Sequence, residues 1–157
     1  MPFTGPGLYE IIPYQAPQLS ANSWEGLMKA GAVVKTYPRG DKTNPSTNAL
    51  WQLALVAGSG DTAEYLIINA RTGYFLTATA DKTITSTPQG SPTDPCCRWY
   101  ITSSPANGYE TFLVKNKVQS RGQLNVKGSS NQPGADILSW PIEDYDNSRW
   151  YFDPHSV

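Results

Sequence analysis

The sequence predicts an all-β protein made of three copies of a four-strand unit, and three observations lead to that prediction. Turn-forming residues are frequent, because Gly and Pro each occur 13 times in the 157 residues. Charged residues make up 16% of the chain, below the roughly 25% of an average soluble domain, while aromatic residues reach 11%. Short apolar segments recur between the turns, and none of useful length shows a clear helical period.

The expected strands form three parallel series along the chain. First strands are expected at residues 8–12, 65–68 and 111–114, and second strands at 19–21, 75–77 and 124–126. Third strands at 32–34, 83–84 and 135–138 each lead to a residue followed by proline, which gives the pairs Tyr37-Pro38, Thr87-Pro88 and Trp140-Pro141. Each fourth strand carries a tryptophan, and these recur at intervals of about fifty residues as Trp51, Trp99 and Trp150.

A large aromatic side chain at the same place in each repeat is typical of a shared core around a pseudo-threefold axis. Three units of this length close on themselves rather than stacking as a solenoid, and a closed barrel leaves no sheet edge exposed. The sequence therefore predicts one β-trefoil domain over residues 1–157. We expect its three pseudo-symmetric repeats at roughly residues 1–56, 57–104 and 105–157.

The charge distribution argues against several classes of partner. The net charge is −1, from 12 basic and 13 acidic residues, and no basic stripe is present to hold a phosphate backbone. No apolar run approaches the roughly 18 residues that a membrane span needs. The first five residues do not resemble a signal peptide. We therefore expect no nucleic-acid partner and no membrane insertion, and a cytoplasmic protein, with unconventional release as the alternative.

Catalytic and metal-binding patterns are not evident in the sequence. His155 is the only histidine, and its place near the C-terminus, where chains usually fray, argues against a catalytic triad. Cys96 and Cys97 are adjacent, so a disulfide between them would be strained, and they lack flanking His ligands for zinc. We interpret them as reduced thiols. The prediction is a protein that is not an enzyme and has no metal and no cofactor.

The late tryptophan of each repeat resembles the signature of the ricin-B-like lectin family, which is Gln, any residue, Trp. The Gln is replaced here by Ala49, Cys97 and Ser148. Four longer segments, residues 10–17, 32–42, 51–69 and 73–79, are similar to an ascomycete agglutinin of this family, and the similarity extends over essentially the whole chain. The resemblance implies a fungal homodimeric lectin that recognises terminal galactose or N-acetylgalactosamine on glycoproteins or glycolipids.

A galactose pocket needs an aromatic face for the apolar side of the ring, a polar group for neighbouring hydroxyls, and a further amide or basic group. By resemblance to the family, the first repeat supplies all of these, from Asn22, Trp24, Tyr37, Arg39, Gly40 and Asn48. Asn22 stands where the family has Asp, so we expect Arg39 to contribute more, through two parallel hydrogen bonds. Trp24 is the favoured stacking residue, and Tyr37 either is the stacking residue instead or packs beneath the turn.

The other two repeats lack part of this set. The second offers Ala78, Thr87 and Cys96 at the matching places, so no pocket is expected there. The third offers Trp140 and Asn147, a weak second site, with Lys127 expected at the place of Asn22. A lysine donates hydrogen bonds but accepts none. The alternative function is a β-trefoil protease inhibitor that acts through an exposed loop at residues 86–95, although inhibition has no need of the aromatic, amide and arginine set.

Overall fold

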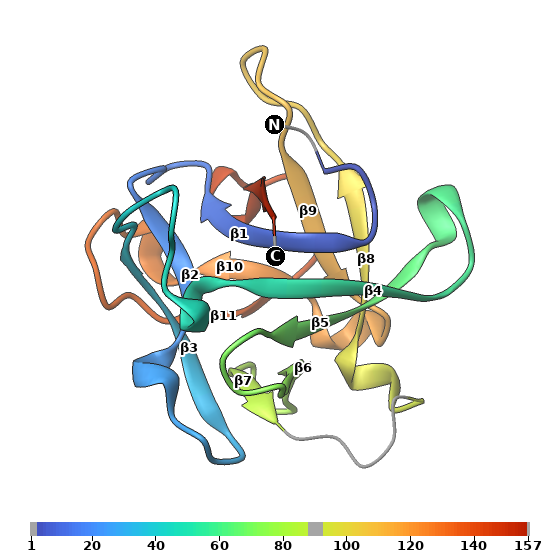
Figure 1. Ribbon diagram of the computed structural model, residues 1–157. Helices are drawn as coiled ribbons and strands as arrows, with labels where there is room; N and C mark the ends of the chain where they lie inside the picture. The colour runs from blue at the N-terminus through green and yellow to red at the C-terminus, as the bar shows by residue number, and fades with distance from the viewer. Residues whose placement is uncertain (1–2, 88–92, 157) are drawn as a thin grey trace.

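The structure is a computed structural model that describes residues 3–87 and 93–156, and six of its strands form a closed barrel (Figure 1). Each strand of the barrel pairs antiparallel with the next, and the last pairs with the first. The closed ring leaves these strands without a free edge. In order around the barrel they are β1 (Gly7–Pro13), β4 (Trp51–Ala57), β5 (Glu64–Asn69), β8 (Arg98–Ser103), β9 (Phe112–Asn116) and β12 (Trp150–His155).

Three hairpins cover one end of the barrel. They are β2 (Leu19–Ser23) with β3 (Ala32–Pro38), β6 (Phe75–Ala78) with β7 (Ile84–Thr87), and β10 (Gln123–Val126) with β11 (Ile137–Trp140). The hairpins also pair with one another, through β3 and β7 and through the isolated bridges Lys35 with Asp136 and Thr83 with Leu138. A six-stranded barrel closed by three hairpins is a β-trefoil, so the predicted fold class is confirmed.

Short 3₁₀ turns join the strands. They are η1 (Trp24–Gly26), η2 (Thr47–Ala49), η3 (Gly60–Thr62), η4 (Pro95–Cys97), η5 (Gln119–Arg121), η6 (Lys127–Ser129) and η7 (Asp146–Ser148). Three of them, η2, η4 and η7, directly precede the strand that carries the late tryptophan of each repeat. None of the helical turns in the described part of the chain is long and apolar enough to cross a membrane.

The three late tryptophans lie at the centre of the core. Trp51, Trp99 and Trp150 are each 0% exposed, which confirms their predicted structural role. Each indole N–H donates to a backbone carbonyl of the second strand in its own repeat, at 3.0 Å to Ala21, 3.0 Å to Leu76 and 3.3 Å to Leu124. A buried indole needs such an acceptor. The three acceptors therefore mark equivalent backbone positions, which aligns the repeats independently of the sequence.

The two ends of the chain are held together by the pairing of β1 with β12, in which Leu8 lies opposite His155. The expectation that His155 lies in a frayed terminus was therefore wrong. The reason is topological: the barrel closes only when the last strand pairs with the first, so the C-terminal strand is an interior member of the ring. Position near the end of a sequence does not imply fraying when a terminal strand is paired.

Part of the second repeat lies outside the described residues. Residues 88–92 include Pro88, the predicted proline turn of that repeat, and half of the loop at 86–95 on which the inhibitor alternative rests. The backbone of Thr87 ends β7 and pairs with Phe75. The inhibitor alternative consequently stays a prediction without structural support.

Candidate functional site

A hollow of about 570 Å³ lies beside the first hairpin, between β2, β3 and the loop before β4. All six predicted residues line it: Asn22, Trp24, Tyr37, Arg39, Gly40 and Asn48. The remaining lining residues are Glu10, Ser20, Glu25, Pro38, Pro45, Ser46 and Ala49. The fold thus brings together on one wall side chains that are 26 residues apart in the sequence, such as Asn22 and Asn48.

Two aromatic side chains form one wall of this hollow. The rings of Trp24 and Tyr37 meet edge to face, with centroids 5.9 Å apart and planes at 74°. The ammonium of Lys35 lies 5.1 Å from the centroid of Trp24. Tyr37 is 51% exposed, so it does not pack beneath the turn. Trp24 is only partly exposed, and therefore Tyr37 offers the more open ring of the pair.

Two amides form the polar side, the buried Asn22 and the partly exposed Asn48. Asn48 donates from Nδ2 to Oδ1 of Asn22 at 3.0 Å, and its own Oδ1 accepts from Ser46. The backbone carbonyl of Asn48 accepts from Asn69 of β5 at 3.0 Å, which ties η2 to the barrel. The Nδ2 of Asn22 makes no hydrogen bond with the described residues. The amide pair is thus held in place while keeping a donor for a ligand.

Arg39 lies at the base of the hollow within an ion cluster. Its Nη2 donates to Glu10 at 2.7 Å and to Asp153 at 2.6 Å, and its Nε donates to Glu10 at 3.2 Å. Burial by itself would lower the pKa of Arg39, but the hydrogen bond and charge of Glu10, followed by those of Asp153, outweigh it and raise that pKa. The edge of the guanidinium expected to grip two sugar hydroxyls is therefore occupied by protein carboxylates, and only Nη1 remains.

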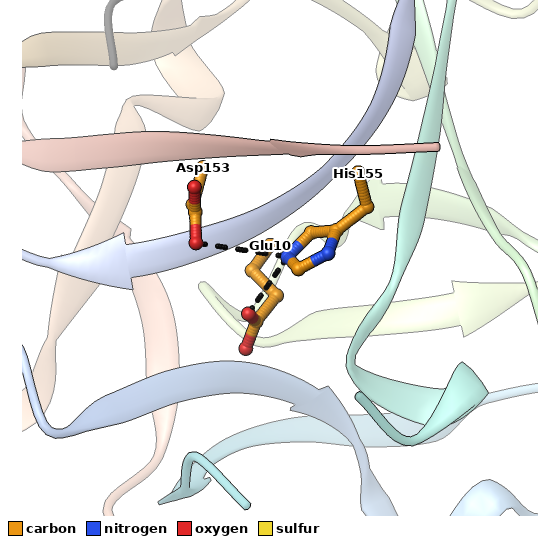
Figure 2. Close-up of side chains that lie close together, drawn as sticks. All are labelled: Glu10, Asp153 and His155. Atoms are coloured by element: carbon orange, nitrogen blue, oxygen red, sulfur yellow. Dashed lines mark hydrogen bonds and ion pairs between the residues drawn. The ribbon is translucent and has the colours of Figure 1, made fainter. Parts of the chain in front are cut away.

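Glu10 is the centre of this cluster. It is 1% exposed, and its Oε1 lies 2.9 Å from Nε2 of His155, which also lies 3.6 Å from Asp153 (Figure 2). The ligand atoms of these three residues lie within 4.8 Å of one another, close enough to hold a metal ion. However, the guanidinium of Arg39 donates to both carboxylates from within the cluster. A divalent cation would have to displace that charge, so the donor set fits a metal poorly.

The sequence reasoning missed Glu10, Ser20, Pro45 and Ser46 among the residues that line the hollow. The one available signal was Glu10 itself, a charged residue in an otherwise apolar first strand. A fully buried Glu is rare unless it is paired, so this residue called for a partner. The Glu10 carboxylate binds Arg39, which directly follows β3 and lies 29 residues away in the sequence. Arg39 also binds Asp153 of β12, which lies 114 residues further along the chain. Only the folded chain reveals such a pairing.

The tryptophan landmarks correct the comparison of repeats. The residue after each carbonyl acceptor is Asn22 in the first repeat, Thr77 in the second and Asn125 in the third. Ala78 and Lys127, which the sequence predicted at the place of Asn22, were therefore wrong. Ala78 lies one position after the true counterpart, and Lys127 lies two positions after it. Lys127 instead begins η6, which matches Trp24 at the start of η1. Strand alignment failed because short strands carry no signal for register.

The third repeat therefore keeps more of the sugar-binding residue types of the first repeat than its sequence suggested. Asn147 donates to Oδ1 of Asn125 at 3.3 Å, which reproduces the amide pair of Asn48 and Asn22. Trp140 pairs with Gln123 across its hairpin as Tyr37 pairs with Ser20. A hollow of about 320 Å³ is lined by Asn125, Lys127, Trp140, Tyr145 and Asn147 among others. Lys127 takes the place of Trp24, so the second aromatic side chain of this hollow is Tyr145, which directly precedes η7.

The two cysteines are free, as expected. Burial, followed by the charge of Asp94, raises the pKa of the Cys97 thiol to about 11, and the same causes raise the pKa of Cys96. A thiol with a raised pKa is a poor nucleophile and a poor metal ligand near neutral pH. Cys97 donates to the backbone carbonyl of Asp94 at 3.1 Å, so its role is to stabilise the turn before β8.

Comparison with known proteins agrees with this geometry. The family described as ricin-type beta-trefoil lectin domain-like matches residues 47–140. An agglutinin of Sclerotinia sclerotiorum is 60% identical over 153 residues, which cover 98% of this chain and 99% of that one. The chain belongs to the ricin-type β-trefoil lectin family. As a member of this family, it is a carbohydrate-binding lectin.

Several solved structures share the fold at low sequence identity. The Rhizoctonia solani agglutinin superposes with a TM-score of 0.77 at 16% identity, covering 99% of this chain and 100% of that one. The designed threefold-symmetric protein ThreeFoil gives a TM-score of 0.77 at 16% identity, over 94% of this chain and 98% of its own. The C-half of an earthworm R-type lectin, solved with GalNAc, gives 0.68 at 14% identity, over 96% and 100%.

Proposed function

We propose that this lectin is a non-catalytic agglutinin that binds terminal galactose or N-acetylgalactosamine in the hollow of the first repeat. The observation that carries the proposal is the convergence there of an aromatic pair and a hydrogen-bonded, partly buried amide pair. A galactose ring has one apolar face for an aromatic side chain and neighbouring hydroxyls for amide donors and acceptors. The 60% identical relative is an agglutinin, and the earthworm lectin was solved with GalNAc, which supports this class of sugar.

The roles differ from those expected by resemblance alone. Asn22 and Asn48 supply the direct polar contacts, because both line the hollow and hold each other in place. Arg39 serves mainly to position the base of the hollow through Glu10 and Asp153, with Nη1 left to reach a hydroxyl. Gly40 lines the hollow without a side chain, and open space lies where its Cβ would be.

We further propose that the third repeat is a weaker second site, formed by Trp140 and Asn147 together with Asn125. The amide pair is retained, and Trp140 is 45% exposed, so one stacking face is available. The presence of Lys127 at the place of Trp24 predicts lower affinity for a neutral sugar. We also propose a homodimer, in keeping with the family resemblance.

The test is calorimetric titration of the full chain with N-acetylgalactosamine, galactose and glucose. The expected result is binding of the first two sugars and no measurable binding of glucose. Asn22→Ala is expected to weaken the tighter site by roughly tenfold, since a buried partner is left unpaired. Asn44→Ala, at an exposed asparagine that does not line the hollow, is the matched control. Equal affinity for all three sugars, or an unchanged affinity in Asn22→Ala, would refute the proposal.

A further inference from the structure

A third hollow, of about 250 Å³, lies between the second and third repeats and has no part in the proposed galactose site of the first repeat. Its walls come from the turn before β7, from η5 and from the end of β11. Trp140 lines both this hollow and the third-repeat hollow, so the two share one aromatic wall. A ligand held against Trp140 therefore has room for a further group on this side.

The charged residues that line this hollow are all basic. Lys82 and Arg121 line it, and no acidic residue does. Neither of the two forms an ion pair with any residue in the described part of the chain. The Lys82 ammonium lies 6.0 Å from the ring centroid of Trp140. Two unpaired cations on one concave surface raise the local concentration of anions.

A buried hydroxyl in the same wall lacks a partner. Ser139 is 1% exposed and lines the hollow, and its Oγ makes no hydrogen bond. Its backbone N–H is satisfied by the carbonyl of Lys82 at 2.9 Å, so only the side chain is left. An unpaired buried hydroxyl is unfavourable, and a hydrogen bond from it to a ligand oxygen would remove that cost.

The acidic residue next to Lys82 in the sequence, Asp81, does not line the hollow. Its carboxylate accepts hydrogen bonds from Thr79 and Thr83, which lower its pKa to about 2. The first-repeat hollow has the opposite character, since Glu10 and Glu25 outnumber Arg39 on its walls.

We propose that the hollow formed by Lys82, Arg121, Ser139 and Trp140 binds the anionic group of an acidic sugar, a carboxylate or a sulfate. This inference rests on the proposed function, because the neutral part of the glycan would lie in the third-repeat hollow across Trp140. Arg121 and Lys82 donate charge-assisted hydrogen bonds to the anion, and Ser139 donates from Oγ. The first repeat then recognises neutral galactosides, while the third repeat selects glycans that carry a negative charge.

The test uses the full chain and follows the indole N–H signals of Trp24 and Trp140 by NMR, assigned with Trp140→Phe. The probes are lactose, 6′-sialyllactose for the carboxylate and 3′-sulfolactose for the sulfate. At least one acidic probe is expected to shift the Trp140 signal at a concentration roughly tenfold lower than lactose. Which of the two does so identifies the anion.

Variants separate this site from the galactose site. The double variant Lys82→Gln with Arg121→Gln is expected to remove the preference for the acidic probe and to leave the response of Trp24 to lactose unchanged. Ser139→Ala is expected to weaken acidic binding by roughly threefold without lowering the melting temperature, because its hydroxyl has no partner in the fold. Lys29→Gln, at an exposed lysine outside the hollows, is the matched control.

Three outcomes would overturn the inference. One is equal response of Trp140 to lactose and to both acidic probes. Another is an acidic preference that survives the double variant. The third is an equally strong response to inorganic sulfate, which would indicate an anion site without a sugar. In each case a Trp24 response to lactose would leave the proposed function standing, whereas loss of that response as well would remove both.

Discussion

At the residue scale, we expect both Trp24 and Tyr37 to contribute to the aromatic contact with the sugar ring. Lys35 covers part of Trp24, and Tyr37 is the more exposed ring. We expect Tyr37→Ala and Trp24→Ala each to weaken N-acetylgalactosamine binding by roughly tenfold, because each removes one half of an edge-to-face pair that lines the hollow. Calorimetry measures the affinity, and near-ultraviolet circular dichroism verifies the fold.

Tyr109→Ala is the control for both variants, since Tyr109 is 57% exposed and does not line the hollow. If Trp24→Ala retained full affinity while Tyr37→Ala lost it, Tyr37 alone would be the stacking residue. Full affinity in both variants would contradict an aromatic role for this wall.

The ion cluster beneath the hollow leads to a prediction about stability. The Glu10 side chain is 2% exposed and the Arg39 side chain 9%, so the pair is buried. Glu10→Gln is expected to lower the free energy of unfolding by about 3 kcal/mol, because it leaves Arg39 with one carboxylate partner, Asp153, in a buried setting. Urea denaturation measures the change, and Glu25→Gln, at an exposed position, is the control. A loss no larger than that of the control would mean that the cluster adds nothing to stability.

At the element scale, the strands that carry the late tryptophans organise the fold. Each of these strands follows a 3₁₀ turn and places its indole against the second strand of its own repeat. Trp99→Ala is expected to destabilise the protein by roughly 3–5 kcal/mol, as truncation of a buried aromatic side chain does. Trp99→Phe keeps most of the volume and loses the indole donor, so it should cost less than half as much.

Thermal unfolding measured by circular dichroism distinguishes these variants. A melting temperature of Trp99→Ala within a degree of the wild type would contradict the core role. A Trp99→Phe variant as unstable as Trp99→Ala would show that the hydrogen bond to Leu76, rather than the volume, is what the strand pair requires.

At the scale of the whole molecule, agglutination requires at least two sugar sites per particle. The first- and third-repeat hollows already give two candidates on one chain, and a homodimer of two-fold symmetry would double them. We expect Trp140→Ala to keep most of the agglutinating activity, because a dimer presents two first-repeat sites. The agglutination titre against erythrocytes measures the activity, and the mass from light scattering measures the oligomeric state. A monomeric mass together with loss of agglutination in Trp140→Ala would show that one chain cross-links through its own two sites.

The sequence by itself determined the fold class and the threefold repeat, and its resemblance to the lectin family indicated six of the residues that line the first hollow. The fold class and the repeat follow from local patterns: turn residues, short apolar segments, and a tryptophan that recurs about every fifty residues. The tertiary structure decided three things that no local pattern contains. It paired Arg39 with Glu10 and Asp153, it placed His155 in the last strand of the barrel, and it put Asn125 rather than Lys127 at the place of Asn22. The physical reason is that ion pairing, ring closure and strand register depend on contacts between segments far apart in the chain, and a strand that slips by one residue reverses the direction of every side chain.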